Sequence, residues 1–102
     1  RVQRSYLGIV GSSRLLDRRI VRFHKLSKDQ AVEIVSMDPA GPARRGGVQI
    51  NDIVVAINGR DVTSVDEIYH FLSEWPIGKK LTLSVIRGKS RIELEVVPVE
   101  AK

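Results

Sequence analysis

Residues 43 to 62 read Ala43-Arg44-Arg45-Gly46-Gly47-Val48-Gln49-Ile50-Asn51-Asp52-Ile53-Val54-Val55-Ala56-Ile57-Asn58-Gly59-Arg60-Asp61-Val62. The adjacent glycines near the start predict the end of a short helix, whose first turn contains Pro42. Ile53 to Ile57 is continuously apolar, which is typical of a strand covered on both faces. Asn58-Gly59 predicts a tight turn, because both residues tolerate positive φ. The stretch therefore predicts a short helix, a loop, a buried strand and a turn, in that order.

Further elements are predicted on both sides of this stretch. Gln30 to Ser36 predicts a strand, with Val32 and Ile34 on one face and Ala31, Glu33 and Val35 on the other. Ser64 to Trp75 predicts a helix, because it begins with the capping box Ser64-Val65-Asp66-Glu67 and is followed by Pro76. Leu81 to Arg87 and Arg91 to Val97 predict two closing strands. With 102 residues and 42% hydrophobic composition, the chain can bury one core and not two.

The run Arg4-Ser5-Tyr6-Leu7-Gly8-Ile9 places a basic residue before an apolar turn that contains glycine. A turn that leaves successive backbone N–H groups unpaired forms a pocket for an anion. Gly8 suits such a turn, because it has no Cβ to obstruct a ligand or to disfavour positive φ. Leu7 to Gly11 predicts a short strand, whose free edge can pair with an extended peptide. The run therefore predicts a site that holds the C-terminus of another chain, with an ordinary buried strand start as the alternative.

The helix over residues 64–75 offers a second wall for this site. Val65, Tyr69 and Leu72 are four and three residues apart, so they share one stripe of the helix. Ile68 and Phe71 flank that stripe and are expected to serve mainly the core. A purely structural role for the whole stripe is the alternative.

The order of these elements resembles that of PDZ domains. The resemblance rests on residues 43–62, on the helix over 64–75 and on the two strands that follow. With the anion-binding loop near the N-terminus, the order is similar to the bacterial, circularly permuted PDZ domains of the HtrA (Do-like) serine proteases. It implies an α+β fold, namely a small, partly open antiparallel β-barrel or sandwich of five to six strands capped by two helices. The resemblance is loose between Ser12 and Lys28.

The resemblance implies a peptide-binding module that captures apolar C-terminal tails by adding them as a strand to Leu7–Gly11. The implied peptide-binding residues are Arg4, Tyr6, Leu7, Gly8, Ile9, Val10, Gly11, Val65, Tyr69 and Leu72. The terminal side chain of the ligand would lie between Ile9, Leu72 and the helix. The expected ligands are C-terminal peptides of unfolded or misassembled proteins.

The chain begins at Arg1 rather than Met, so we expect residues 1–102 to be one PDZ domain of a longer protein. The resemblance implies that this parent is a serine endopeptidase of protein quality control, with its catalytic domain before Arg1 as a partner of this domain. It also implies a bacterial periplasmic or other extracytoplasmic location, with membrane anchoring of the parent left open. A membrane metalloprotease, a C-terminal processing protease and a secretion component are alternative parents.

The net charge of +5 is concentrated in one segment. Its basic residues are Arg14, Arg18, Arg19, Arg22, Lys25 and Lys28. Asp17 to Leu26 shows apolar residues at both helical and strand spacing, and we predict a helix that begins at Asp17, with Phe23 facing a core. A solvated basic face is the simplest interpretation, and a module that binds an acidic protein or an anionic membrane surface through residues 12–28 is the alternative. Nucleic acid is not expected, because this segment lacks the interleaved aromatic residues that stack on bases.

No catalytic site is expected in this chain. His24 and His70 are the only histidines, and neither lies in a nucleophile motif such as Gly-x-Ser-x-Gly. The sequence holds no His-Glu-x-x-His, Walker loop or EF-hand pattern, so no metal or cofactor is expected. Cysteine is absent, which excludes disulfides and thiolate chemistry. No apolar run approaches the roughly 20 residues that span a bilayer.

Overall fold

The computed structural model describes residues 5–100. In chain order the elements are β1 (Ser5–Tyr6), β2 (Ile9–Leu15), α1 (Arg18–Phe23), β3 (Gln30–Met37), α2 (Pro42–Arg45), β4 (Ile53–Ile57), β5 (Arg60–Asp61), α3 (Val65–Glu74), β6 (Leu81–Arg87), β7 (Ser90–Val96) and β8 (Val99–Glu100). The strands and helices predicted over residues 30–36, 42–45, 53–57, 64–75, 81–87 and 91–97 are therefore present, with bounds that differ by a residue or so.

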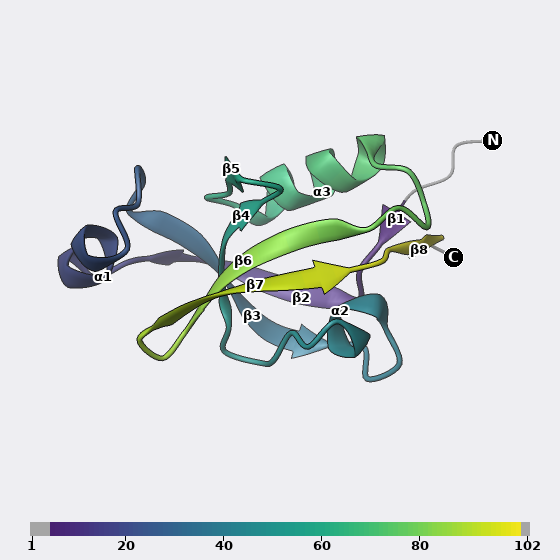
Figure 1. Ribbon diagram of the computed structural model, residues 1–102, viewed down its shortest axis with the longest axis horizontal. Helices are drawn as coiled ribbons and strands as arrows, with labels where there is room; N and C mark the ends of the chain where they lie inside the picture. The colour runs from purple at the N-terminus through teal and green to yellow at the C-terminus, as the bar shows by residue number, and fades with distance from the viewer. Residues whose placement is uncertain (1–4, 101–102) are drawn as a thin grey trace.

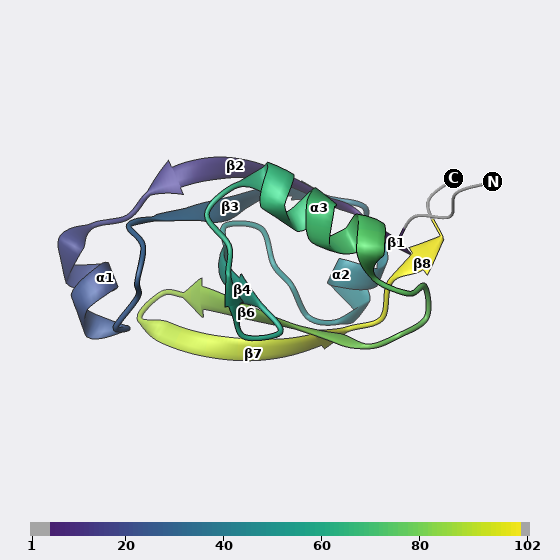
Figure 2. The same ribbon diagram turned by 90° about the horizontal axis from the view of Figure 1, so that it is seen from above.

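The strands form one antiparallel sheet and one small pair. The larger sheet has six strands in the order β2-β3-β4-β6-β7, with β5 paired to β4, and β1 pairs with β8. Helix α3 lies over one side of the sheet and alongside β2, α2 lies near the end where β1 and β8 meet, and α1 lies at the other end (Figures 1 and 2). The predicted α+β class is confirmed, and the partly open barrel or sandwich is an antiparallel sheet that does not close. Residues 5–100 contain three helices rather than two, because the loosely matched segment forms α1.

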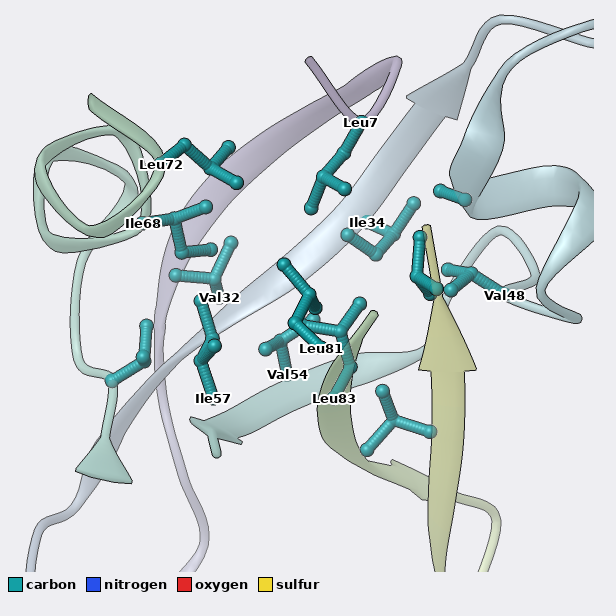
Figure 3. Packing of buried hydrophobic residues seen from close by; sticks show 14 residues of the cluster. Leu7, Val32, Ile34, Val48, Val54, Ile57, Ile68, Leu72, Leu81 and Leu83 are labelled. Carbon is teal, nitrogen blue, oxygen red and sulfur yellow. The ribbon is translucent and has the colours of Figure 1, made fainter. Parts of the chain in front are cut away.

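The main core fills the space between α3 and the sheet (Figure 3). Leu7, Ile34 and Leu83 are at most 1% exposed and meet there from three different parts of the chain. Ile68 and Leu72 enter the same cluster from α3. Because α3 contributes two side chains to this cluster, its distance from the sheet is fixed by core packing.

A second, smaller core lies beneath α1. Leu16, Ile53 and Ile86 are among its buried members, and Ile20 and Val21 of α1 pack against it. Asp17 caps α1 by accepting a hydrogen bond from the backbone N–H of Arg19 at 2.7 Å, as the predicted helix start requires. Phe23, however, is 73% exposed, so the expectation that it faces a core is wrong. Helix α1 has only 6 residues, and the face that packs against the smaller core carries Ile20 and Val21 instead of Phe23.

The turns predicted within residues 42–62 are present in the structure. Pro42 occupies the first turn of α2, and Gly46 closes the helix with its N–H on the carbonyls of its last turn. Every residue of β4 is buried. Asn58 and Gly59 both have positive φ, at 49° and 79°, as the predicted Asn-Gly turn requires. These turns place β4 in the middle of the sheet, where both of its edges are paired.

Candidate functional site

One long edge of β2 is unpaired among the described strands. Strand β2 pairs with β3 along Ile9 to Leu15 and with no other strand of residues 5–100. The predicted strand over Leu7–Gly11 is wrong in its bounds: Leu7 and Gly8 form a turn between β1 and β2, and the strand begins at Ile9. The reason is that Gly8 has a φ of +77°, which is incompatible with extended pairing at that position.

The turn at Leu7 and Gly8 is held through its carbonyl groups. The N–H of Ala43 donates to the Leu7 carbonyl at 3.0 Å, and the N–H of Asp38 donates to the Gly8 carbonyl at 2.9 Å. Within residues 5–100, the N–H groups of Leu7 and Gly8 have no hydrogen-bond acceptor. The connection between β3 and α2 thus turns both carbonyls inward and leaves two successive N–H groups available at the start of the open edge.

Gly8 is required by this arrangement. A Cβ at residue 8 would lie 3.0 Å from the Asp38 Cβ and 3.4 Å from the Gly41 Cα, and the positive φ already disfavours a side chain. Gly41 is constrained in turn, because a Cβ there would lie 3.3 Å from the Leu7 carbonyl oxygen. The prediction that Gly8 has positive φ is therefore confirmed, and its packing against Asp38 and Gly41 supplies a second reason for glycine.

Tyr6 lies in β1 just before the turn and is 38% exposed. Its hydroxyl donates to the Asp38 Oδ2 at 3.3 Å. Partial desolvation and the neighbouring Asp38 carboxylate raise the pKa of Tyr6 above its usual value, so the hydroxyl stays protonated. Asp38 thus contacts the turn twice, through its backbone N–H and through its side chain. Arg4, the basic residue predicted to assist an anion, lies outside the described residues.

The remaining predicted residues of β2 differ in exposure. Ile9 is half-buried and packs against the main core, whereas Val10 is 54% exposed. Gly11 faces α3, because a Cβ built on it would lie 3.3 Å from the Val65 Cγ2. A Cβ there would also lie 2.5 Å from the Val32 Cγ1, so glycine at this position is required mainly by the packing of β2 against β3.

The three predicted residues of α3 also lie in different environments. Val65 is partly buried against the core, and Tyr69 is 53% exposed. Leu72 is 4% exposed and belongs to the main core, so its side chain supports the fold whatever else it contacts (Figure 3). Ile68 is 1% exposed, as expected for a core residue of this helix. Of the three predicted residues of α3, therefore, Val65 and Tyr69 are less buried than Leu72.

Hydrogen bonds at both ends fix α3 beside this edge. At its start, Ser64 Oγ accepts from the Glu67 N–H at 3.3 Å, as the capping box predicts. The Glu67 carboxylate reaches back to Thr63, where it accepts from the backbone N–H at 2.8 Å and from the hydroxyl. At the other end, the Ser5 hydroxyl donates to the Trp75 carbonyl and joins β1 to the helix.

Sequence reasoning missed the residues that hold the turn. Asp38, Gly41 and Ala43 contact Leu7 and Gly8, although the Asp38-Pro39-Ala40-Gly41-Pro42 run predicts only the end of a strand. The sequence did indicate a turn at Asp38, because an Asp side chain often accepts a hydrogen bond from the N–H two residues later. In the structure the Asp38 Oδ1 accepts from the Ala40 N–H at 2.9 Å. Nothing in the sequence pointed from that turn to Gly8.

The described residues offer no metal centre, since no group of three or more His, Asp or Glu side chains gathers within 5–100. His70 Nε2 lies 3.4 Å from the Glu74 Oε1 on the solvent side of α3, with both side chains largely exposed. A cavity of about 540 Å³ lies between α3 and the β4–β5 hairpin, away from the open edge of β2. None of the described helices has the length and apolar character needed to cross a membrane.

Comparisons with known proteins agree with this arrangement. A family model described as the PDZ domain matches residues 33–87. A probable periplasmic serine endoprotease, DegP-like, from Pseudomonas fluorescens is 28% identical over 106 residues, which cover 100% of this chain and 22% of the relative. The chain thus spans about a fifth of the length of that curated relative.

Solved structures share the fold. The HtrA-type protease AlgW with decapeptide superposes with a TM-score of 0.80 at 19% identity, over 99% of this chain and 30% of that chain. The HtrA3 PDZ domain bound to a phage-derived ligand (FGRWV) superposes with a TM-score of 0.72 at 23% identity, over 97% of this chain and 88% of that one. With the family model covering more than half of its length, this chain belongs to the PDZ domain family.

Proposed function

We propose that this domain captures apolar C-terminal tails by adding them as a strand to the open edge of β2. The observation that carries the proposal is the pair of unbonded N–H groups of Leu7 and Gly8 at the start of that edge. Two successive N–H groups without an acceptor suit a carboxylate. An unpaired strand edge suits an extended backbone, which gains main-chain hydrogen bonds along Ile9 to Gly11.

The position of the turn sets the direction of the bound tail. The turn precedes β2, so a tail whose carboxylate lies at Leu7 and Gly8 has its last residue beside the start of the strand. Its earlier residues then run toward the end of β2, antiparallel to it. The tail lies between β2 and α3, with Val65 and Tyr69 as the helix wall.

The terminal side chain of the tail lies in this proposal between Ile9, Leu72 and α3. Ile9 is half-buried and Leu72 nearly fully buried, so this part of the site is apolar and continuous with the core. Burial of one aliphatic side chain contributes about 1.5–3 kcal/mol. The site therefore selects an apolar last residue, with Tyr6 near the carboxylate end.

The domain is proposed to serve a trypsin-type serine endopeptidase of protein quality control, as a substrate-recruiting or regulatory module. This is supported by the names of the relatives, which include probable periplasmic DegP-like endoproteases. It is also supported by the names of the structural neighbours, which include an HtrA-type protease with a decapeptide and the HtrA3 PDZ domain bound to a phage-derived ligand. In this proposal the parent protein lies in the bacterial periplasm, and the ligands are tails of unfolded or misassembled proteins. The parent's catalytic domain is then the second partner, and residues 1–102 act as one non-catalytic domain.

The test compares peptides that differ only at their last group. Peptides that end in an apolar residue with a free carboxylate should bind the full 102-residue chain, and the amidated peptides should bind at least about tenfold more weakly. Amidation removes the charge but keeps the side chains and the strand-forming backbone. Equal affinity of acid and amide in titration calorimetry would exclude carboxylate capture at Leu7 and Gly8.

A further inference from the structure

One end of the molecule is formed by α1 and by the turn that joins β6 to β7. We call these residues, 18–25 with 88–89, the α1 tip. The body measures 44 Å along its long axis, and β1 and β8 lie at the end opposite the α1 tip (Figures 1 and 2). Residues 19, 20, 23 and 24 of the helix segment and residues 88 and 89 of the turn line one shared hollow of about 340 Å³. The two segments therefore form a single surface.

Most cations of the α1 tip form no ion pair with the described residues. Arg18, Arg22, Lys25 and Lys89 are exposed, and within residues 5–100 none of them has a carboxylate oxygen within 4.0 Å. Arg19 is the exception, since its Nε lies 3.6 Å from the Asp17 Oδ1. Unpaired cations of this density produce a positive field at this end of the molecule.

Phe23 stands among these cations and is not needed for packing. Its side chain is 73% exposed, the highest exposure among the large hydrophobic residues of the described chain. Ile20 and Val21 attach α1 to the smaller core, of which Phe23 is not a member, and the Phe23 ring lies edge-on to His24, at 4.9 Å between ring centroids. An aromatic ring left in water at the apex of a cationic surface is a candidate for contact with another body.

We propose that the α1 tip binds the surface of an anionic lipid bilayer, with Phe23 entering the headgroup region. Cations attract the negative surface, and an aromatic ring beside them partitions into the interface. A protein partner is less well matched, because a stable complex buries roughly 800 Å² of each partner and α1 is a helix of only 6 residues. A bilayer requires no such area and no fixed shape from the surface that it meets.

This contact leaves the peptide site open. Strand β2 starts beside β1, at one end of the molecule, and reaches α1 at the other end (Figure 2). The turn at Leu7 and Gly8 therefore faces away from a bilayer held at the α1 tip. The domain can then bind a membrane and a tail at the same time. The affinity for either ligand can be measured in the absence of the other.

The experiment sediments the full 102-residue chain with vesicles at about 0.1 M salt. One set contains equimolar phosphatidylglycerol and phosphatidylethanolamine, and the other contains phosphatidylcholine alone. The chain should sediment with the first set of vesicles and not with the second. Arg22→Gln with Lys25→Gln should weaken binding at least about tenfold, since each cation near an anionic surface contributes about fivefold.

One control and two variants of Phe23 make the result specific to the α1 tip. Arg44→Gln with Arg45→Gln removes the same charge from α2, near the opposite end, and should leave binding within about threefold of the parent chain. Phe23→Trp, made with Trp75→Phe to remove the only native tryptophan, should show a blue shift in fluorescence when anionic vesicles are added. Phe23→Ser should weaken binding at least about fivefold.

Several results would overturn the proposal. Equal binding to both vesicle types would do so, as would an equal loss in the Arg44/Arg45 pair, which would mean that net charge alone is sensed. An unshifted emission spectrum of the Phe23→Trp variant, in a chain that sediments with anionic vesicles, would show that the side chain at this position stays in water. Binding to soluble polyglutamate as tight as to anionic vesicles would assign the α1 tip to an acidic protein instead.

Discussion

The backbone N–H of Asp38 donates to the carbonyl oxygen of Gly8 at 2.9 Å, so the end of β3 holds the turn from which β2 starts. With the Ala43 N–H on the Leu7 carbonyl, this bond fixes the orientation of two peptide groups. The peptide group of the Leu7 carbonyl carries the Gly8 N–H, so the direction of this donor is fixed before an anion arrives. The proposed carboxylate pocket is thus built by the β3–α2 connection as much as by the turn itself.

Gly8→Val should abolish tail binding or weaken it at least about tenfold in titration calorimetry. Valine resists positive φ, and its Cβ would lie 3.0 Å from the Asp38 Cβ, so the turn and its N–H groups must shift. Gly59→Val is the matched control: it has a φ of +79° but no atom within 4 Å of the added Cβ. The two variants share backbone strain, so a Gly8→Val protein that stays folded and binds like Gly59→Val would remove this turn from the site.

Val65→Asp should weaken tail binding at least about tenfold, because it places a carboxylate in the apolar wall beside the open edge. Val65 is the right residue to test, since its Cγ2 approaches Gly11 of β2. His70→Asp adds the same group to the solvent side of α3 and should leave affinity unchanged. Leu72→Asp is a poorer test, because Leu72 belongs to the main core and its loss would unfold the chain. Equal affinities of Val65→Asp and His70→Asp would place the tail elsewhere.

The elements of this fold were predictable where the signal was local. The Asn58-Gly59 turn, the apolar β4 and the Ser64 cap each depend on a few adjacent residues, and each is confirmed. The start of β2 was predicted wrongly because it is decided by contacts with Asp38 and Gly41, which lie far along the chain. A short apolar run gives no indication of where pairing begins when a distant segment sets it.

Side-chain environments were less predictable than elements. Phe23 was expected in a core because its neighbours are apolar, but a helix of six residues has one buried face, and Ile20 and Val21 occupy it. The Asp52 carboxylate, which the sequence places only in a turn, is buried and bound by a guanidinium from β6. Such partners are chosen by tertiary packing, which a single sequence does not display.

The Arg87 guanidinium holds the buried Asp52 carboxylate through two bonds, Nε to Oδ1 at 2.9 Å and Nη2 to Oδ2 at 2.8 Å. Arg87→Met should lower the free energy of unfolding by about 3 kcal/mol, because a carboxylate that is 2% exposed would lose its cation. Lys80→Met is the control, since it breaks a pair with Glu95 in which both side chains are mostly exposed, and should cost less than about 1 kcal/mol. Urea unfolding of both variants gives the comparison, and equal losses would mean that the buried pair contributes no more than a surface one.

The cap of α3 should make stability depend on pH. The hydroxyl and the N–H of Thr63 both donate to the Glu67 carboxylate, and they lower its pKa from the ordinary value of 4.5. A carboxylate whose pKa is lowered by folding stabilises the folded chain above its unfolded pKa, and this contribution is lost as the pH falls through the folded pKa. Glu67→Gln should therefore be less stable than the parent chain at neutral pH, and the difference should disappear below the folded pKa.

Asp66→Asn separates this bond from a general effect of charge at the start of the helix. It removes a negative charge from the same turn of α3 but leaves the Thr63 contacts intact. Charge near a helix start contributes about 0.3–1 kcal/mol at exposed positions, so Asp66→Asn should cost less than Glu67→Gln at neutral pH. Chemical denaturation of the three proteins across the acid range measures both differences. If the stability gap between the parent chain and Glu67→Gln keeps its size in acid, the carboxylate is not what Thr63 holds, and the cap acts through the neutral oxygen alone.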